Sequence, residues 1–153
     1  MRPLIALVLV AACLTGAAAP ARGARPPSLL VQARHLVAMP YRDFLAVKAS
    51  APLAPFDWTS DGCSRTPPAW AVVFDGPCEQ HDFGYRNFGN GLLLERTEAR
   101  RAWIDGRLLA GLREVCAERY PGLARTAQWL RCRARARLMW AAVRTFNDWS
   151  STI

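Results

Sequence analysis

The sequence predicts a small all-α domain that is cross-linked by disulfides and built around two long antiparallel helices. Three observations support this fold class. Apolar residues recur at helical spacing in several segments, no segment alternates like a strand over a useful length, and an even number of cysteines remains after removal of an N-terminal signal. The chain has 153 residues, and we expect one domain over residues 28–153.

Residues 1–19 have the features of a secretory signal peptide. Arg2 supplies the positive start, residues 4–14 are an apolar run too short to span a bilayer, and the alanines at 17–19 suit a cleavage site. Two alternatives stay open, a buried N-terminal helix and lipidation of Cys13. Residues 20–27 are rich in proline and form a flexible lead-in. The signal predicts a secreted, extracellular protein.

Disulfides are expected because the exported chain keeps an even number of cysteines. After Cys13 leaves with the signal, the remaining cysteines are Cys63, Cys78, Cys116 and Cys132. Several connectivities are possible, and we expect Cys63 to pair with Cys78 and Cys116 with Cys132, since each link joins neighbouring elements. Zinc bound by Cys63, Cys78 and His81 is the alternative, but export and the absence of a Cys-x-x-Cys pair argue against it.

Two short helices are expected at the start of the domain. Ser28 can cap the first, which ends or bends at Pro40. The second follows over about residues 41–49, before two prolines break the chain. Their apolar faces are candidates to line a channel for a bound apolar chain.

A loop and then a third helix follow. Residues 56–63 mix carboxylates, hydroxyls and a glycine without helical periodicity, and Pro67 and Pro68 extend this irregular region. The helix is expected to begin near Gly76 and Pro77, because proline is favoured in a first helical turn, and to stop by residues 89–91.

This third helix carries the most informative residues of the chain. Cys78, His81, Asp82 and Tyr85 lie at offsets of three, four and seven, which share one helical face. Leucine or valine normally fills such a face, because an imidazole beside a carboxylate is costly to bury unless both are paired or bind a metal. The pattern therefore predicts a reaction site.

Two long helices complete the domain, over about residues 97–120 and 123–149, with Thr97 as the expected N-cap and a Pro-Gly turn between them. The first has an apolar stripe of Leu108, Leu112, Val115 and Cys116. Asp105 stands one turn earlier on that stripe, where an apolar residue is expected. The inward face of the last helix is expected to hold Trp129, Cys132, Ala136, Met139, Val143 and Phe146.

The formal net charge of +8 is carried almost wholly by arginine. Such a surface favours a polyanion, either nucleic acid or an anionic lipid surface, and charge alone does not choose between them. An arginine-rich composition can equally reflect the source genome.

Three segments carry a family resemblance. They are Asp61-Gly-Cys63, Cys78-x-x-His81-Asp82-Phe83-Gly84-Tyr85-Arg86-Asn87 and Ile104-Asp105. Together they resemble the prokaryotic secreted phospholipase A2 family, above all its actinobacterial branch, over roughly residues 56–146. The resemblance implies a calcium-dependent enzyme that hydrolyses the sn-2 ester of glycerophospholipids to a fatty acid and a lysophospholipid.

The candidate catalytic residues are His81 and Asp105. Histidine can take a proton from water near neutral pH. Asp82 cannot orient the ring, because adjacent side chains on a helix do not face each other, whereas Asp105 on the next helix can. The resemblance implies the same pairing. Tyr85 either braces Asp105 through its hydroxyl or is a core aromatic residue, and we expect the core role.

The resemblance also implies a calcium-binding loop. The Asp61 side chain, the Gly62 carbonyl and the Asp82 side chain would bind one Ca²⁺ with waters, and such oxygen ligands suit this ion. A Cys63–Cys78 bridge would hold the loop against the helix. The family often has a larger residue at the position of Gly62, and a glycine there is expected to loosen the loop and weaken metal affinity.

Two functions of different classes compete. The leading one is a secreted phospholipase A2 that acts as a monomer on a phospholipid membrane or micelle, with no nucleic-acid partner. The alternative is a non-catalytic cationic helical module that binds membranes or nucleic acid. It explains the arginines but leaves His81 and Asp105 unexplained. A zinc hydrolase or nuclease is a weaker third hypothesis.

Overall fold

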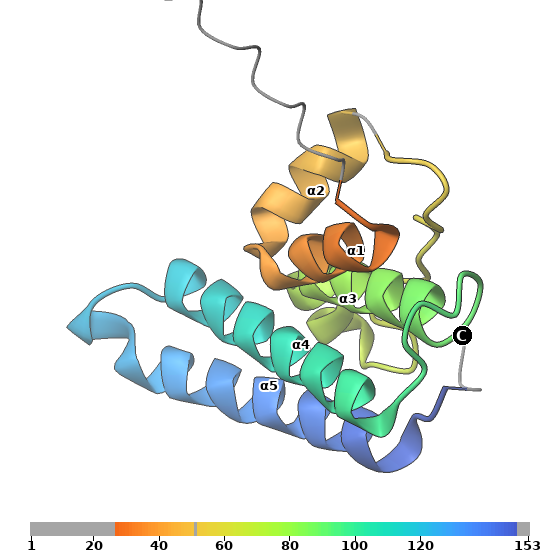
Figure 1. The fold of residues 1–153 in the computed structure, drawn as a ribbon. Coiled ribbons are helices and arrows are strands. Elements are labelled where there is room, and N and C mark those ends of the chain that lie inside the picture. The colour runs from red at the N-terminus through yellow and green to blue at the C-terminus, as the bar shows by residue number, and fades with distance from the viewer. Residues whose placement is uncertain (1–26, 51, 150–153) are drawn as a thin grey trace, which may run out of the picture.

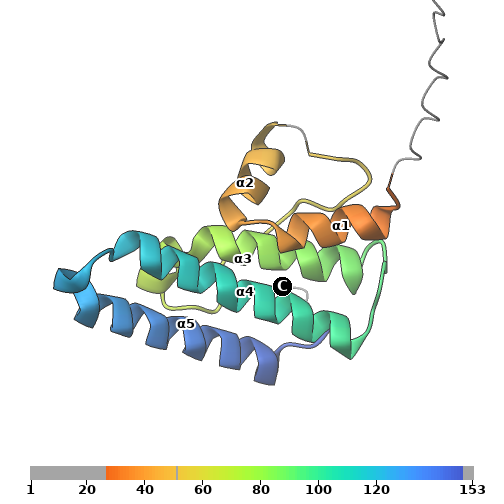
Figure 2. The ribbon, with the colours of Figure 1, turned by 60° about the vertical axis from the view of Figure 1, so that its left-hand side comes forward.

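The computed structural model describes residues 27–50 and 52–149, and this part of the chain is helical, with no strand. The helices are α1 (Leu29–Ala38), α2 (Tyr41–Ser50), α3 (Pro68–Phe88), α4 (Glu98–Arg119) and α5 (Thr126–Phe146), with a 3₁₀ turn at Leu123–Arg125. Figures 1 and 2 show α4 and α5 side by side, α3 against the other side of α4, and α1 and α2 over α3. The predicted all-α class and the antiparallel pair of long helices are confirmed. Within the described segments, no helix is both long and apolar enough to cross a bilayer.

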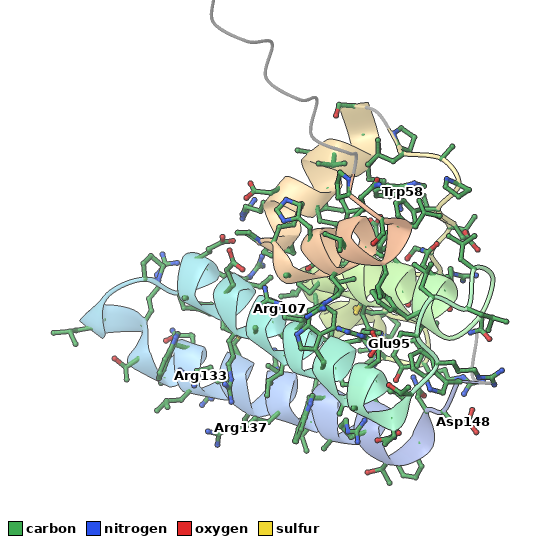
Figure 3. All side chains as sticks on the ribbon, in the orientation of Figure 1. Trp58, Glu95, Arg107, Arg133, Arg137 and Asp148 are labelled. Carbon is green, nitrogen blue, oxygen red and sulfur yellow. A yellow bond between two sulfur atoms is a disulfide. The ribbon has the colours of Figure 1, made fainter. Side chains whose placement is uncertain are left out.

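The two short helices form where the sequence predicts them. The Ser28 hydroxyl accepts a hydrogen bond from the Val31 amide at the start of α1. At the other end of α1, Arg107 of α4 donates to the carbonyls of Val37 and Ala38, at 3.3 and 2.6 Å. Arg107 lies between the two helices in Figure 3. These carbonyls have no partner within α1, so the guanidinium both caps α1 and fastens it to α4.

The start of α3 differs from the prediction. The helix begins at Pro68, and Pro77 lies inside it. Pro68 sits at the helix start, where a missing N–H costs nothing. Phe74 is buried in the core formed with α4 and α5, and this packing holds the turns before Pro77 in place. Gly111 leaves room for the proline ring, since a Cβ there would lie 3.1 Å from Pro77 Cβ.

The ends of the long helices follow their expected signals, with one correction. Thr97 caps α4 by accepting from the Arg100 amide at 3.1 Å, and α4 ends before Tyr120. The last helix is shorter than predicted, because a 3₁₀ turn precedes α5 and α5 ends at Phe146. Cys132, Ala136 and Met139 are buried as expected, but Phe146 is 78% exposed, so its predicted inward position is wrong.

Both predicted disulfides are present among the described residues. Cys63–Cys78, with Cα atoms 5.3 Å apart, ties the loop before α3 to α3 itself. Cys116–Cys132, with Cα atoms 5.6 Å apart, ties α4 to α5 near the turn that joins them. Both thiols of the alternative zinc site are thereby consumed, so that interpretation is wrong.

Candidate active site

The predicted contact between α3 and α4 is made at His81 and Asp105. His81 Nε2 lies 2.9 Å from Asp105 Oδ1, and the two side chains are 8% and 0% exposed. Gly84 allows the helices to approach, since a Cβ there would lie 2.7 Å from Ile104 Cγ2. The Tyr85 hydroxyl donates to the same Asp105 oxygen at 2.8 Å. Tyr85 is also buried in the core, so both interpretations of this residue hold.

The second oxygen of Asp105 faces arginine. Arg144 Nη1 donates to Oδ2 at 2.8 Å, and Arg101 Nη1 lies 3.7 Å from the same oxygen. Burial raises the pKa of Asp105, but the hydrogen bonds and charge of His81, together with Arg144 and Tyr85, outweigh burial and hold the pKa below its usual value. The carboxylate is thus ionised and can only accept hydrogen bonds.

The charge of Asp105 defines the tautomer of the neutral imidazole. Because Asp105 accepts, His81 Nε2 carries the proton and Nδ1 keeps its lone pair. Burial and the Asp105 carboxylate raise the pKa of Tyr85, so its phenol stays protonated and remains a donor. His81 therefore offers Nδ1 as a proton acceptor, while Asp105 binds the proton on Nε2.

Sequence reasoning missed the arginines behind Asp105 and the residue that holds them. Arg101 lies four residues before Asp105 on α4, and this i,i+4 spacing was an available signal. Arg144 comes from α5 and has no such local signal. Both arginines also pair with Glu98, whose Oε1 accepts from Arg144 Nη2 at 2.6 Å.

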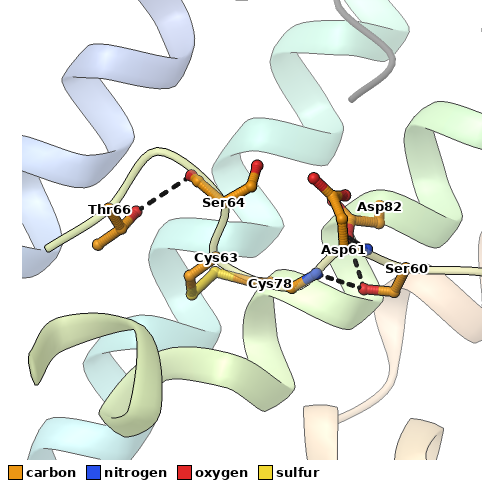
Figure 4. The surroundings of a disulfide bond; sticks show 8 residues. Ser60, Asp61, Cys63, Ser64, Thr66, Cys78 and Asp82 are labelled. Atoms are coloured by element: carbon orange, nitrogen blue, oxygen red, sulfur yellow. Dashed lines mark hydrogen bonds between the residues drawn. A yellow bond between two sulfur atoms is a disulfide. The ribbon is translucent and has the colours of Figure 1, made fainter. Parts of the chain in front are cut away.

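The loop before α3 meets the other predicted site residues. Asp82 Oδ2 accepts from the Ser60 hydroxyl at 2.6 Å and from the Asp61 amide at 3.2 Å, and the Gly62 amide donates to Ser60 Oγ at 2.9 Å. Figure 4 shows Ser60, Asp61 and Asp82 together beside the Cys63–Cys78 bridge. The bridge anchors the loop directly beside α3.

The Asp82 carboxylate has too little positive charge around it. The pKa of Asp82 is raised to about 6, because burial, together with the neighbouring Asp61, outweighs the Ser60 hydrogen bond and His81. Asp61 itself lies 3.5 Å from Arg86 Nη2. No group of three His, Cys, Asp or Glu side chains in the described segments could hold a metal ion. Asp61 and Asp82 nevertheless bring carboxylate oxygens to this loop, and such hard oxygen ligands suit Ca²⁺.

Gly62 is required by the backbone and by the space around it. Its φ is +66°, in the left-handed region, and a Cβ there would lie 2.6 Å from Asp75 Oδ1. The Asp75 carboxylate thus occupies the position of a side chain at residue 62. The weaker metal affinity expected from this glycine stays a prediction.

A cavity of about 550 Å³ opens beside His81 and Asp82. The loop over residues 62–67 lines one side, and the apolar residues from α5 are Leu138, Met139, Ala142, Val143 and Phe146. Among the described residues, α1 and α2 contribute nothing to this lining, so the channel predicted from those helices is wrong for this cavity. Their buried residues instead pack against Phe83 and Phe88 of α3.

Comparison with known proteins supports the family that the sequence motifs predict. The family model described as prokaryotic phospholipase A2 matches residues 33–147. The chain belongs to the prokaryotic phospholipase A2 family. The match begins within α1 and includes α2, and so extends beyond the segment on which the sequence resemblance was based.

Two fungal relatives of this phospholipase A2 family member are informative. A secretory phospholipase A2 of Arthroderma benhamiae is 32% identical over 144 residues, which cover 93% of this chain and 94% of that protein. A secretory phospholipase A2 of Beauveria bassiana is 37% identical over 67 residues, covering 42% of this chain and 34% of that protein. The predicted family is therefore confirmed.

Proposed function

We propose that this protein is a secreted, calcium-dependent phospholipase A2 that hydrolyses the sn-2 ester of glycerophospholipids. The observation that carries the proposal is the buried His81–Asp105 pair beside an apolar cavity, in a chain of this family. A non-catalytic binding module gives no reason to pay for burying an imidazole and a carboxylate together. The residues from 28 onward would form one catalytic domain behind the signal peptide.

His81 is the proposed general base. Its Nδ1 takes a proton from water as the water oxygen attacks the ester carbonyl, and Asp105 stabilises the resulting imidazolium through Nε2–H. When the tetrahedral intermediate collapses, the C–O bond to the glycerol breaks and the imidazolium returns its proton to the departing alkoxide. The products are a fatty acid and a lysophospholipid, and no covalent enzyme intermediate forms.

Asp61, Gly62 and Asp82 are the residues that would hold Ca²⁺. The raised pKa of Asp82 supports this role, because a cation would supply the positive charge that its surroundings lack. When bound, the ion would act as a Lewis acid for the developing oxyanion. The Ser60 hydroxyl and the Cys63–Cys78 bridge keep the loop carboxylate and the helix carboxylate together.

A phospholipid membrane or micelle is the proposed partner of the cavity mouth. Leu138 and Phe146 line the cavity yet are 61% and 78% exposed, so they present apolar surface where the acyl chain would enter. Arg65 lies in the lining, and Arg135 stands over the ring of Trp70, which also lines the cavity. Cationic and apolar groups at one opening suit an anionic lipid surface better than nucleic acid. We propose that a monomer binds there.

Hydrolysis of mixed micelles tests the proposal. A phosphatidylcholine with different sn-1 and sn-2 chains is incubated with calcium or with EGTA, and the lysolipid is analysed by mass. We expect release of the sn-2 chain only with calcium, and a loss of about 10³-fold in His81→Asn. Full activity in EGTA, or in His81→Asn, would contradict the mechanism. Lipid damage without hydrolysis that survives His81→Asn would favour the binding module.

A further inference from the structure

Both carboxylate oxygens of Asp105 accept hydrogen bonds, and the donors to the two oxygens come from different helices. Oδ1 accepts from His81 of α3 and from Tyr85 of α3. Oδ2 accepts from Arg144, which comes from α5 on the opposite side of α4. The three long helices thus meet at a single buried carboxylate. The reaction requires only the contact with His81, so the α5 contact calls for a separate explanation.

The Arg144 guanidinium spans two carboxylates. Nη1 lies 2.8 Å from Asp105 Oδ2, and Nη2 lies 2.6 Å from Glu98 Oε1. A planar guanidinium held at both ends has little freedom to turn, and it fixes the plane of the carboxylate that it contacts. Arg101, 3.7 Å from the same Asp105 oxygen, adds positive charge without a hydrogen bond of this quality.

The position of Arg144 also connects the pair to the cavity wall. Val143 precedes it, and Phe146 and Asn147 follow it, all lining the cavity. The Asn147 carbonyl accepts from Arg101 at 2.7 Å, so this contact adds to the two that Arg144 makes with α4.

We propose that Arg144 is a positioning residue for the His81–Asp105 pair. Its guanidinium, anchored by Glu98, sets the rotation of the Asp105 carboxylate so that Oδ1 points at His81 Nε2. The inference rests on the proposed function of that pair. Arg144 acts through Asp105 and does not touch the substrate, so its loss lowers kcat more than it raises KM.

Kinetics of Arg144→Gln and Arg144→Lys test this proposal. We expect Arg144→Gln to lower kcat by about 10²-fold with little change in KM, because a small misplacement at the reacting atoms has an effect of that size. Arg144→Lys restores the charge but cannot bridge both carboxylates, so it recovers only part of the rate. Arg137→Gln is the matched control, since Arg137 is exposed on α5 and its label in Figure 3 stands at the outer side of that helix. A loss in Arg144→Gln that appears in KM alone overturns the proposal.

A double-substitution cycle separates positioning from a general effect on the fold. If Arg144 acts through Asp105, Arg144→Gln has almost no further effect on kcat in an Asp105→Asn background. Losses that multiply in the double variant overturn the proposal. If Arg144→Gln does not fold, Glu98→Gln serves instead. Glu98 is exposed, and the change weakens its contact with the Arg144 guanidinium on the side away from Asp105.

The imidazole N–H signal of His81 supplies a readout that does not depend on activity. In protein labelled with ¹⁵N-histidine, we expect Arg144→Gln to move or broaden the Nε2 proton resonance, while Arg137→Gln leaves it unchanged. If Arg144→Gln changes this resonance but the wild-type protein hydrolyses no lipid, the proposed function is refuted and the positioning role stands. An active protein whose signal and kcat are both indifferent to Arg144→Gln refutes the positioning role alone.

Discussion

Asp105 contacts His81, and Asp82 follows His81 in the sequence, but the pKa values of the two carboxyls are shifted in opposite directions. Asp105 is fully buried, yet one histidine, one tyrosine and two arginines surround it and its pKa is held below the usual value. Asp82 is less buried, yet its pKa is raised to about 6, because burial and the neighbouring Asp61 carboxyl outweigh the Ser60 hydrogen bond and His81. The chain itself balances the charge of Asp105, whereas the proposed calcium ion would balance the charge of Asp82. The His81–Asp105 pair is therefore preformed, whereas the proposed calcium loop would depend on its ligand.

The largest effect on activity and stability is expected from removing the charge of Asp105. Asp105→Asn should lower kcat by about 10³- to 10⁴-fold, because His81 loses the acceptor that fixes its tautomer. It should also lower the free energy of unfolding by about 3 kcal/mol, since two arginines then face an uncharged amide in a buried site. Steady-state hydrolysis and urea denaturation measure the two losses. A stable variant with normal kcat would show that the two carboxylates do not differ as described.

The two disulfides test the comparison through the elements that they hold. Replacing either pair by serine should lower stability by roughly 3 kcal/mol, given the separations of 15 and 16 residues. Only Cys63→Ser with Cys78→Ser should also diminish the rise in melting temperature on adding calcium, because only that bridge anchors the loop of Asp61. Equal calcium responses in the two variants would argue against this loop as the metal site.

In the absence of metal, Asp82→Asn should raise the free energy of unfolding, whereas Asp105→Asn lowers it. A carboxyl whose folded pKa is raised from 3.8 to about 6 favours folding when protonated, so the wild-type protein loses stability as pH rises through that window. In EGTA at pH 8, Asp82→Asn should therefore be more stable than wild type by roughly 2 kcal/mol, allowing for partial solvent exposure. The difference should vanish near pH 4. Calcium should stabilise the wild type only, and a calcium-induced shift that survives in Asp82→Asn would remove Asp82 from the metal site.

The smallest effect is expected at the glycine of the loop. Gly62→Ala should cost about 1–2 kcal/mol, because its φ of +66° and the nearby Asp75 carboxylate both disfavour a side chain. Gly106→Ala is the matched control, since a Cβ there meets nothing within 4 Å and position 106 lies inside α4. It should stabilise the protein by up to about 1 kcal/mol. Two changes of the same sign, measured by thermal unfolding, would contradict the role assigned to Gly62.

The predictable features of this molecule are those encoded by local spacing. The Thr97 cap, the Pro-Gly turn and the face shared by His81 and Tyr85 need only the helical repeat. Asp105 was found because a carboxylate interrupts an apolar stripe. Pro77 misled the prediction, since local preference places proline at a helix start while the packing of Phe74 extends the helix past it.

The features that could not be predicted depend on how helices are placed against one another. Arg144 resembles the other arginines of α5 in sequence, and only the register of α5 on α4 brings it to Asp105. The sequence favours α1 and α2 as the channel wall, whereas the cavity is lined from α5 and those two helices pack in a core cluster with Phe83 and Phe88 of α3. Phe146 fits the apolar period of α5 but is the last residue of that helix, and its side chain is largely exposed.

The helix α5 is fastened to α4 by different chemistry at its two ends. A covalent bond at Cys132 secures the end near the interhelical turn, and ionic contacts at Arg144 secure the end beside His81. Cleavage of the Cys116–Cys132 bridge therefore frees the remote end of α5 and leaves the contacts of Arg144 in place, whereas concentrated salt screens the exposed Glu98 contact and loosens the end beside His81 first. Reduction of this bridge and high salt should thus loosen α5 from opposite ends.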